Sequence, residues 1–302
     1  MRYVITGATG AIGMALIKKL VGFPHEILVI ANPDSERNER LSLYKSIRII
    51  ECNLYEYDTI DLGEKYDVFF HFAWIGGHCR SDLELNMKSA TCAMDAVRLA
   101  HRLGCTTFIG AGSQAECGQT ISPIDVNTVC KPDSAFGAAK LYAYNQTRKI
   151  SENFGLNFYW ARILSIYGPY DRDGSLVMST ILRVLNKQSL AFTSGNQIWD
   201  FLYADDAADA LFAISKHGKP DSIYVIGSGD ARELRDYIKE LLEEFNLDAN
   251  QYLGLVPYSD NQVMHLVANT DPLRQEFNWK PKIPFRRGIQ LTIEYCNRLK
   301  LI

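Results

Sequence analysis

Residues 3–21 read YVITGATGAIGMALIKKLV, which is an apolar strand, a glycine-rich turn and an apolar helix in one short run. Gly7 suits the tight turn, Gly10 leaves room for a pyrophosphate beside the backbone, and Gly13 lets the helix pack closely on the strand. The amino end of the helix offers N–H groups without intrahelical partners, which favours an anion there. A glycine-rich turn that binds nothing is the alternative. The run predicts a dinucleotide site at the start of the chain.

Short apolar runs alternate with helical segments through the first half of the chain. Further strands are expected at residues 26–31, 47–51, 67–72, 106–109 and 157–163, and the two longest helices at residues 83–103 and 134–154. Such alternation is typical of a parallel sheet with helices on both faces. The expected fold class is therefore α/β, a Rossmann-type doubly wound parallel sheet with a smaller C-terminal substrate-binding domain.

The alternation of strands and helices loosens after Tyr170, which indicates a second and smaller unit. We expect a dinucleotide-binding Rossmann domain at residues 1–169, with a return segment at about residues 197–228. Residues 170–196 and 229–302 are expected to form the smaller substrate-binding domain.

Composition argues against several classes of protein. With 32 Lys and Arg against 35 Asp and Glu, the net charge is -3, so no basic surplus is available to neutralise a nucleic-acid backbone. The seven cysteines are scattered and never form a C-x-x-C pair, which argues against a disulfide framework and a zinc site. Met1 leads almost directly into a strand without a signal peptide, and no apolar run reaches the roughly 18 residues of a membrane span. We expect a cytoplasmic protein with reduced thiols and a small-molecule substrate, and neither a metal, a nucleic acid nor a membrane as partner.

Further motifs continue along nearly the whole chain. They are His71-Phe72-Ala73 after the fourth strand, Asn86, Ser113 after the fifth strand, Lys140, Tyr167-Gly168-Pro169, Gln197, Asp200-Phe201, Asp205-Asp206 and Asn278-Trp279-Lys280-Pro281. Together with the glycine spacing, this set resembles the extended short-chain dehydrogenase/reductases that act on nucleotide-linked sugars. The resemblance implies a nicotinamide cofactor, a nucleotide-diphosphate sugar as substrate, and a homodimer formed through the two long helices.

The resemblance assigns catalysis to Ser113, position 136 and Lys140. Residues 135–140 read AFGAAK, in which every neighbour of a Tyr-x-x-x-Lys motif is present but Phe136 replaces the tyrosine. Positions four apart on a helix share a face, so both side chains can reach one ligand. The resemblance implies that Lys140 binds the ribose hydroxyls and lowers the pKa of a phenol at position 136, while Ser113 orients the sugar oxygen.

Phe136 cannot donate a proton, and the loss of a general acid costs roughly two to four orders of magnitude in rate. Three explanations stay open. In the first, which we favour, Phe136 is an engineered change of Tyr to Phe that traps a ligand. In the second, the chain is a naturally inactive relative, and in the third, the enzyme uses another acid.

The reaction is suggested by the residues after Ser113. Relatives that dehydrate sugars carry an acidic pair there, whereas this chain has Gln114 and Ala115, and Glu116 is one place out of register. The leading hypothesis is an NADPH-dependent 4-ketoreductase of a nucleotide-linked 4-keto-6-deoxy sugar, in a pathway for surface polysaccharide, with activity crippled by Phe136. The alternatives are an NAD-dependent nucleotide-sugar 4-epimerase and a catalytically inactive NADP(H)-binding sensor protein.

The cofactor preference is expected to depend on the end of the second strand. Ala31 stands where an acidic residue would accept the ribose hydroxyls of NAD, and Ser35, Arg37 and Arg40 suit a 2'-phosphate, so NADP(H) is preferred and NAD(H) is possible. A solvated loop of mixed charge is the alternative. The expected cofactor-binding residues are Gly7, Thr9, Gly10, Ala11, Ile12, Asn32, Ser35, Arg37, Asn53, Leu54, Phe72, Ala73, Lys140 and Ile163.

The substrate side departs from the relatives in two places. Arg is common among them at the position of Trp199 and again near residues 258–260, so the diphosphate is expected to be held differently here, through Arg80 or Arg232. The expected substrate-binding residues are Gly76, Arg80, Ser113, Gln114, Ser165, Ser175, Leu176, Gln197 and Trp199.

Overall fold

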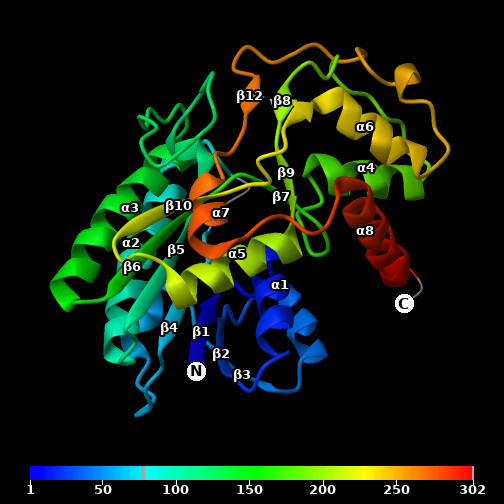
Figure 1. The fold of residues 1–302 in the computed structure, drawn as a ribbon. Coiled ribbons are helices and arrows are strands. Elements are labelled where there is room, and N and C mark those ends of the chain that lie inside the picture. The colour runs from blue at the N-terminus through cyan, green and yellow to red at the C-terminus, as the bar shows by residue number, and fades with distance from the viewer. Residues whose placement is uncertain (76–78, 301–302) are drawn as a thin grey trace.

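A seven-stranded parallel sheet forms the centre of the protein (Figure 1). The computed structural model describes residues 1–75 and 79–300. The strands lie in the order β10-β6-β5-β4-β1-β2-β3, and every neighbouring pair is parallel. Their bounds are β1 Arg2–Thr6, β2 Glu26–Ala31, β3 Ile47–Glu51, β4 Val68–His71, β5 Thr107–Ser113, β6 Asn157–Ile163 and β10 Ser222–Ile226. This arrangement confirms the predicted Rossmann-type doubly wound sheet.

Helices cover both faces of this sheet, and alternate residues of β1 show how the sequence divides between them. Tyr3 and Ile5 pack in one core with α1 (Ala11–Leu20) and α5 (Ala204–His217). Val4 lies in a second core with α2 (Leu83–Arg102) and α3 (Ala135–Phe154). Successive side chains of a strand point to opposite faces, so a strand that is apolar throughout is buried on both sides.

The two long helices begin and end at residues suited to those places. The side chain of Asp82 accepts a hydrogen bond from the N–H of Leu85 at the start of α2, and Ser134 accepts one from the N–H of Gly137 at the start of α3. Gly155 ends α3 with a φ of 66°, a left-handed conformation that glycine adopts without a steric penalty. These caps agree with the helices predicted at residues 83–103 and 134–154.

The second half of the chain builds smaller elements beside the sheet (upper right in Figure 1). The helices α4 (Leu176–Leu185), α6 (Leu234–Glu243) and α8 (Phe285–Lys300) contribute to a core of their own. Two short sheets join this part of the chain to the rest, one of β11 (Arg232–Glu233), β8 (Ile198–Trp199) and β12 (His265–Leu266), the other of β7 (Ser165–Tyr167) and β9 (Phe201–Tyr203). Short 3-10 helices are η1 (Glu36–Leu43), η2 (Leu54–Thr59), η3 (Gln114–Glu116) and η4 (Ala249–Gln251).

The C-terminal segment contacts both parts. Leu273 of α7 (Asp271–Phe277) and the following Trp279 pack in the core that α1 and α5 share, whereas Ile289 of α8 packs with α4 and α6. The division into a Rossmann domain of residues 1–169 with about 197–228, and a smaller domain of residues 170–196 and 229–302, stays a prediction.

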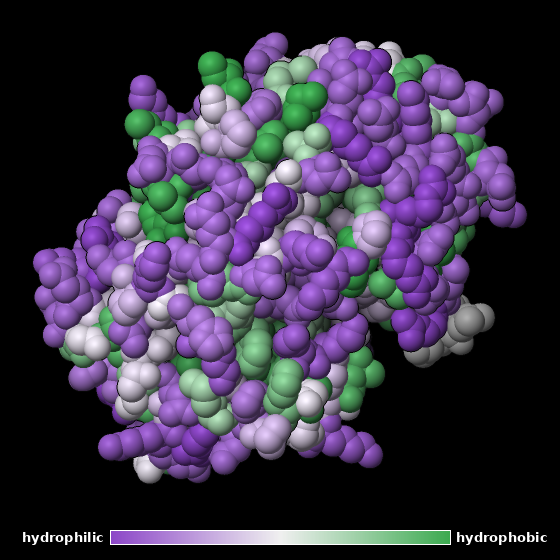
Figure 2. Space-filling view, in the orientation of Figure 1, coloured by the Kyte–Doolittle hydropathy of each residue, from purple (hydrophilic) through white to green (hydrophobic). Residues whose placement is uncertain are grey.

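Hydrophilic residues dominate the face shown in Figure 2, and hydrophobic residues appear there in small separate groups. Within residues 1–75 and 79–300, no helix combines the length and the apolar character needed to cross a lipid bilayer.

Candidate active site

The carboxyl ends of the parallel strands meet at one edge of the sheet, which is where ligands of doubly wound sheets bind. The strand register pairs Thr6 with His71 and Ser113 with Ile163 at this edge. The predicted cofactor residues follow the strands that end there: Gly7, Thr9, Gly10, Ala11 and Ile12 after β1, Asn32, Ser35 and Arg37 after β2, Asn53 and Leu54 after β3, Phe72 and Ala73 after β4, and Ile163 at the end of β6. Their contact with a cofactor stays a prediction.

The glycine-rich turn fits a dinucleotide pyrophosphate. Gly7 has a φ of +68°, and a Cβ on it would lie 2.5 Å from the backbone nitrogen of Ala73, so this turn can pack on the end of β4 only as glycine. A Cβ on Gly13 would lie 2.6 Å from Ala8. In contrast, a Cβ on Gly10 would meet only the Gly7 oxygen, 3.7 Å away, so Gly10 faces open space. The helix α1, described in full, starts without a side-chain cap or an acidic residue in its first turn, which leaves its positive end for an anion.

Arg40 links this turn to the second half of the chain. Its Nη1 atom donates a hydrogen bond of 2.8 Å to the carbonyl oxygen of Thr9, and its guanidinium lies 5.3 Å from the ring centre of Tyr170. Arg40 therefore holds the turn in place. Ser35 is half-buried and Arg37 is exposed, and these two residues remain the candidates for a 2'-phosphate.

Lys140 is buried between a carbonyl oxygen and an indole ring. Its Nζ atom donates a hydrogen bond of 2.7 Å to the carbonyl oxygen of Ala111 on β5 and lies 3.7 Å from the ring centre of Trp74. Burial lowers the pKa of Lys140 to about 7, because removing the ammonium group from water disfavours its charged form. The helix α3 thus brings Lys140 to the strand that ends at Ser113, as the sequence predicts.

Phe136 lies one helical turn before Lys140 and, like Lys140, contacts the ring of Trp74. The Nζ atom of Lys140 is 5.8 Å from the centre of the Phe136 ring, and the ring of Trp74 meets that ring edge-on with centres 5.9 Å apart. The guanidinium of Arg80 lies 4.9 Å from the ring centre of Phe136, and the backbone N–H of Phe136 donates to the carbonyl oxygen of Arg80. Position 136 is therefore where the motif requires it, without the phenol oxygen.

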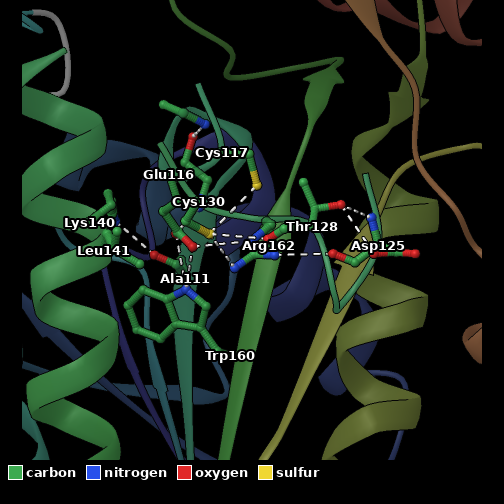
Figure 3. A network of polar contacts seen from close by, with 12 residues as sticks. Ala111, Glu116, Cys117, Asp125, Thr128, Cys130, Lys140, Leu141, Trp160 and Arg162 are labelled. Carbon is green, nitrogen blue, oxygen red and sulfur yellow. Dashed lines mark hydrogen bonds and ion pairs between the residues drawn. The ribbon is translucent and has the colours of Figure 1, made fainter. Parts of the chain in front are cut away.

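A buried ion pair holds the backbone at Ser113 (Figure 3). Glu116 is fully buried and accepts hydrogen bonds from the backbone N–H of Ser113 at 2.7 Å, from Nε1 of Trp160 at 3.0 Å and from Nε of Arg162 at 3.2 Å. The Ser113 side chain in turn accepts a hydrogen bond from the N–H of Ala115. Glu116 thus faces the interior of the protein and stabilises the turn that carries Ser113.

His71 belongs to the packing of the strand ends. Its Nδ1 atom lies 2.8 Å from the hydroxyl of Thr6, and its complete burial lowers the pKa of His71 to about 3, so the imidazole is neutral near pH 7.

The predicted substrate residues that the structure describes lie on several elements. Trp199 of β8 donates a hydrogen bond of 2.8 Å from Nε1 to the hydroxyl of Ser165 on β7, which brings these two together. Ser175 and Leu176 begin α4, Gln197 is buried before β8, and Gln114 is half-buried beside Ser113. Gly76 lies outside the described residues.

Of the two arginines suggested for the diphosphate, only Arg80 lies beside the predicted catalytic position 136. Arg232 pairs with Glu240 and lines a separate cavity of about 730 Å³ that also includes Trp279 and Phe285.

Comparison with known proteins identifies the family. The model of the NAD dependent epimerase/dehydratase family matches residues 3–227. The chain belongs to this family.

Proteins whose names describe different reactions resemble this chain over nearly their whole length. A probable dTDP-glucose 4,6-dehydratase of Sinorhizobium fredii is 25% identical over 98% of this chain and 92% of its own. A dTDP-6-deoxy-L-talose 4-dehydrogenase (NAD(+)) of Aggregatibacter actinomycetemcomitans is 26% identical over 85% of this chain and 95% of its own. A Tyr-to-Phe mutant of UDP-glucuronic acid 4-epimerase from Bacillus cereus, in complex with UDP-4-deoxy-4-fluoro-glucuronic acid and NAD, superposes with a TM-score of 0.87 at 19% identity over 99% of this chain and all of its own.

Two features of this family member were missed from the sequence. Trp74 lies three residues beyond the end of β4, and its indole covers the ammonium group of Lys140, yet an aromatic residue after a strand gives no sign of its partner. The pair of Glu116 and Arg162 joins β6 to the turn after β5. Two signs of this pair are present in the sequence: Glu116 is out of register with the acidic positions of sugar dehydratases, and Arg162 lies within a largely apolar strand.

Proposed function

We propose that this protein is a 4-ketoreductase of a nucleotide-linked 4-keto-6-deoxy sugar, with NADP(H) as the preferred cofactor and a turnover limited by Phe136. The observation that carries the proposal is that α3 brings Lys140 and position 136 to the strand that ends at Ser113. The two residues after Ser113, Gln114 and Ala115, have no carboxylate. Reduction of a ketone needs a hydride donor, a proton donor and a group that orients the oxygen, and it needs no acid for elimination.

Each residue would have a defined task. The hydroxyl of Ser113 orients the sugar oxygen, and Lys140 binds the ribose of the cofactor once its hydrogen bond to Ala111 is exchanged. A bound nicotinamide cofactor supplies or accepts a hydride. Position 136 would deliver the proton to the oxygen, which Phe136 cannot do, so binding is retained while turnover falls by about two to four orders of magnitude.

The relatives support parts of this proposal. The name of the Aggregatibacter enzyme describes oxidation and reduction at position 4 of a nucleotide-linked 6-deoxy sugar, the chemistry proposed here. Dehydration is disfavoured in this chain by Gln114 and Ala115, and by the inward orientation of Glu116. The Bacillus cereus structure is of a Tyr-to-Phe mutant with a sugar nucleotide and NAD bound, so a protein of this fold that has lost a tyrosine hydroxyl can bind both.

The preferred cofactor is tested by the relative affinity for NADPH and NADH. No acidic side chain ends β2, where Ala31 lies, and Arg37 is exposed on η1, the next element of the chain. We expect tighter binding of NADPH, and the change Arg37→Ala should weaken NADPH about tenfold while leaving NADH unchanged. Arg98→Ala, which removes an exposed arginine from α2, is the matched control. Tighter binding of NADH to the unaltered protein would contradict the preference and favour the NAD(H) alternative.

The reaction is tested by restoring the phenol. The change Phe136→Tyr should raise the rate of NADPH oxidation about 100-fold or more with the correct nucleotide-linked 4-keto-6-deoxy sugar. Phe154→Tyr, at the other end of the same helix, should leave the rate unchanged. A panel of such sugars with different nucleotides identifies the substrate by the sugar that responds.

Other outcomes point to the alternative functions. Interconversion of sugar epimers by Phe136→Tyr, without net consumption of NADPH, would favour the 4-epimerase. A protein that binds the cofactor but stays inactive in both forms would favour the sensor protein, which the phenylalanine itself supports. We also propose a homodimer through α2 and α3, which pack together and expose Leu83 and Tyr142.

A further inference from the structure

Two cysteines from different segments meet beside the turn that carries Ser113 (Figure 3). Cys117 follows η3 directly, and Cys130 lies in the loop that leads to α3. Their sulfur atoms are 3.9 Å apart. Cys117 is buried and Cys130 is half-buried, so a small solute reaches Cys130 first.

The backbones at these two cysteines are already in contact. The N–H of Lys131 donates a hydrogen bond of 3.3 Å to the carbonyl oxygen of Cys117. The next residue, Gly118, has a φ of +68°, and the space where its Cβ would lie is taken by the carbonyl oxygen of Lys131. A disulfide has a sulfur–sulfur distance of about 2.0 Å, so its formation requires the two side chains to approach without separating or unfolding the segments.

The surroundings of Cys130 favour its thiolate. Nη2 of Arg162 lies 3.3 Å from the Cys130 sulfur, while Nε of the same arginine binds Glu116. A hydrogen bond from Cys117 and the positive charge of Arg162 lower the pKa of Cys130 to about 7, whereas the pKa of Cys117 is raised. The pair therefore consists of one thiol that is readily ionised and accessible, and a second that stays protonated beside it.

We propose that Cys117 and Cys130 form a peroxide-oxidisable dithiol, with Cys130 as the sulfur that reacts first and Cys117 as the one that closes the disulfide. The Cys130 thiolate attacks one oxygen of hydrogen peroxide, the O–O bond breaks, and Cys130 becomes a sulfenic acid as hydroxide leaves. Cys117 then displaces the hydroxyl group from Cys130, the S–S bond forms, and the Cys117 proton leaves with that hydroxyl as water. In total, two thiols and one peroxide give one disulfide and two waters.

Oxidation at this site would act on the candidate active site. Cys117 is bonded to Glu116, whose carboxylate holds the backbone N–H of Ser113, and the carbonyl oxygen of Ala115 closely contacts Gly137 of α3. A disulfide would shift the turn that carries Ser113 and remove the thiolate from Arg162. This effect on turnover rests on the proposed function, whereas the oxidation itself does not.

The test maps thiols in the complete protein. Hydrogen peroxide is added in steps, the remaining thiols are blocked with iodoacetamide, and peptides are identified by mass spectrometry without reduction. We expect a cross-linked pair of peptides containing Cys117 and Cys130, formed at a lower peroxide concentration than any oxidation of the half-buried Cys79 and reversed by dithiothreitol.

Variants keep the test decisive. Cys130→Ser should abolish the cross-link, Cys117→Ala should leave a sulfenic acid on Cys130 that reacts with dimedone, and the control Cys79→Ser should keep the cross-link. The proposal is overturned if Cys117 and Cys130 are both still free to be alkylated at a peroxide concentration that has already oxidised Cys79. It is also overturned if Cys130 becomes a sulfinic acid and no cross-link forms. A cross-link without a change in the turnover of the Phe136→Tyr protein would leave the dithiol standing and count against its effect on catalysis.

Discussion

Replacing Glu116 by Gln tests whether the buried ion pair holds the candidate active site together. The carboxylate accepts from three donors, the N–H of Ser113, Nε1 of Trp160 and Nε of Arg162, and it balances the charge of an arginine that is 1% exposed. Glutamine has nearly the same size but offers a single oxygen. Its NH2 group must therefore face one of the three donors, and Arg162 is left without its counter-charge.

The expected loss of stability is large. Breaking a buried ion pair by removing one partner costs about 3 to 5 kcal/mol, because the remaining charge stays buried without compensation. Domains unfold with a total free energy of roughly 5 to 15 kcal/mol, so Glu116→Gln should remove about a fifth or more of the free energy of unfolding.

Urea denaturation followed by circular dichroism measures this loss. Glu152→Gln is the matched control, because Glu152 pairs with Lys149 at the surface, and exposed pairs contribute at most about 1 kcal/mol. The double variant Glu116→Gln with Arg162→Met should recover part of the loss, since it also removes the uncompensated charge. If Glu116→Gln unfolds at the same urea concentration as Glu152→Gln, the ion pair does not stabilise the turn and the reasoning fails.

Two further predictions concern Lys140 and the glycine turn. Burial lowers the pKa of Lys140 to about 7, well below the value of about 10.4 in an unfolded chain, so between these pH values the unfolded chain holds a proton that the folded chain lacks, and stability rises with pH. Lys140→Met should therefore be more stable than the unaltered protein at pH 6 to 7 by on the order of 3 kcal/mol, and this difference should shrink toward pH 10. Cofactor binding should weaken in the same variant. If urea denaturation gives a stability difference that does not change with pH, the pKa of Lys140 is not depressed. Gly10→Ala should weaken cofactor binding about tenfold or more without loss of stability, because a Cβ at Gly10 has open space. Gly7→Ala should destabilise the fold by about 2 kcal/mol or more, because Gly7 has a φ of +68° and lies close to Ala73. Equal melting temperatures for the two variants would contradict this distinction.

Much of the fold could be predicted because it follows from local patterns. The strands at residues 26–31, 47–51 and 157–163 have the same bounds in the structure, since each is an apolar run bounded by polar or turn-forming residues. The fifth strand extends to Ser113, beyond the predicted residue 109, because Gly110 and Gly112 hide its continuation in the sequence. Space for Trp160 explains these glycines, as a Cβ on either would meet the indole.

The candidate site was predictable only where motif spacing determines position. Phe136 and Lys140 lie where a helical repeat of four residues places them. Gly7 lies against Phe72 and Ala73 because β1 and β4 are neighbouring parallel strands whose ends lie side by side. The contact of Trp74 with Lys140 could not be predicted, because it joins residues 66 positions apart through side-chain directions that no local pattern specifies. The same holds for Cys117 and Cys130, whose proximity depends on the path of the loop before α3.

The position of Trp74 gives the protein an intrinsic optical probe. Its indole lies on the ammonium group of Lys140 and meets the ring of Phe136 edge-on, so a molecule that reaches Lys140 alters the surroundings of this ring first. Trp160 and Trp279 are buried in other contacts, and Trp199 lies on β8. Quenching or a wavelength shift of the fluorescence that disappears in Trp74→Phe would therefore report a ligand bound beside Lys140 and Phe136, and this measurement needs no turnover.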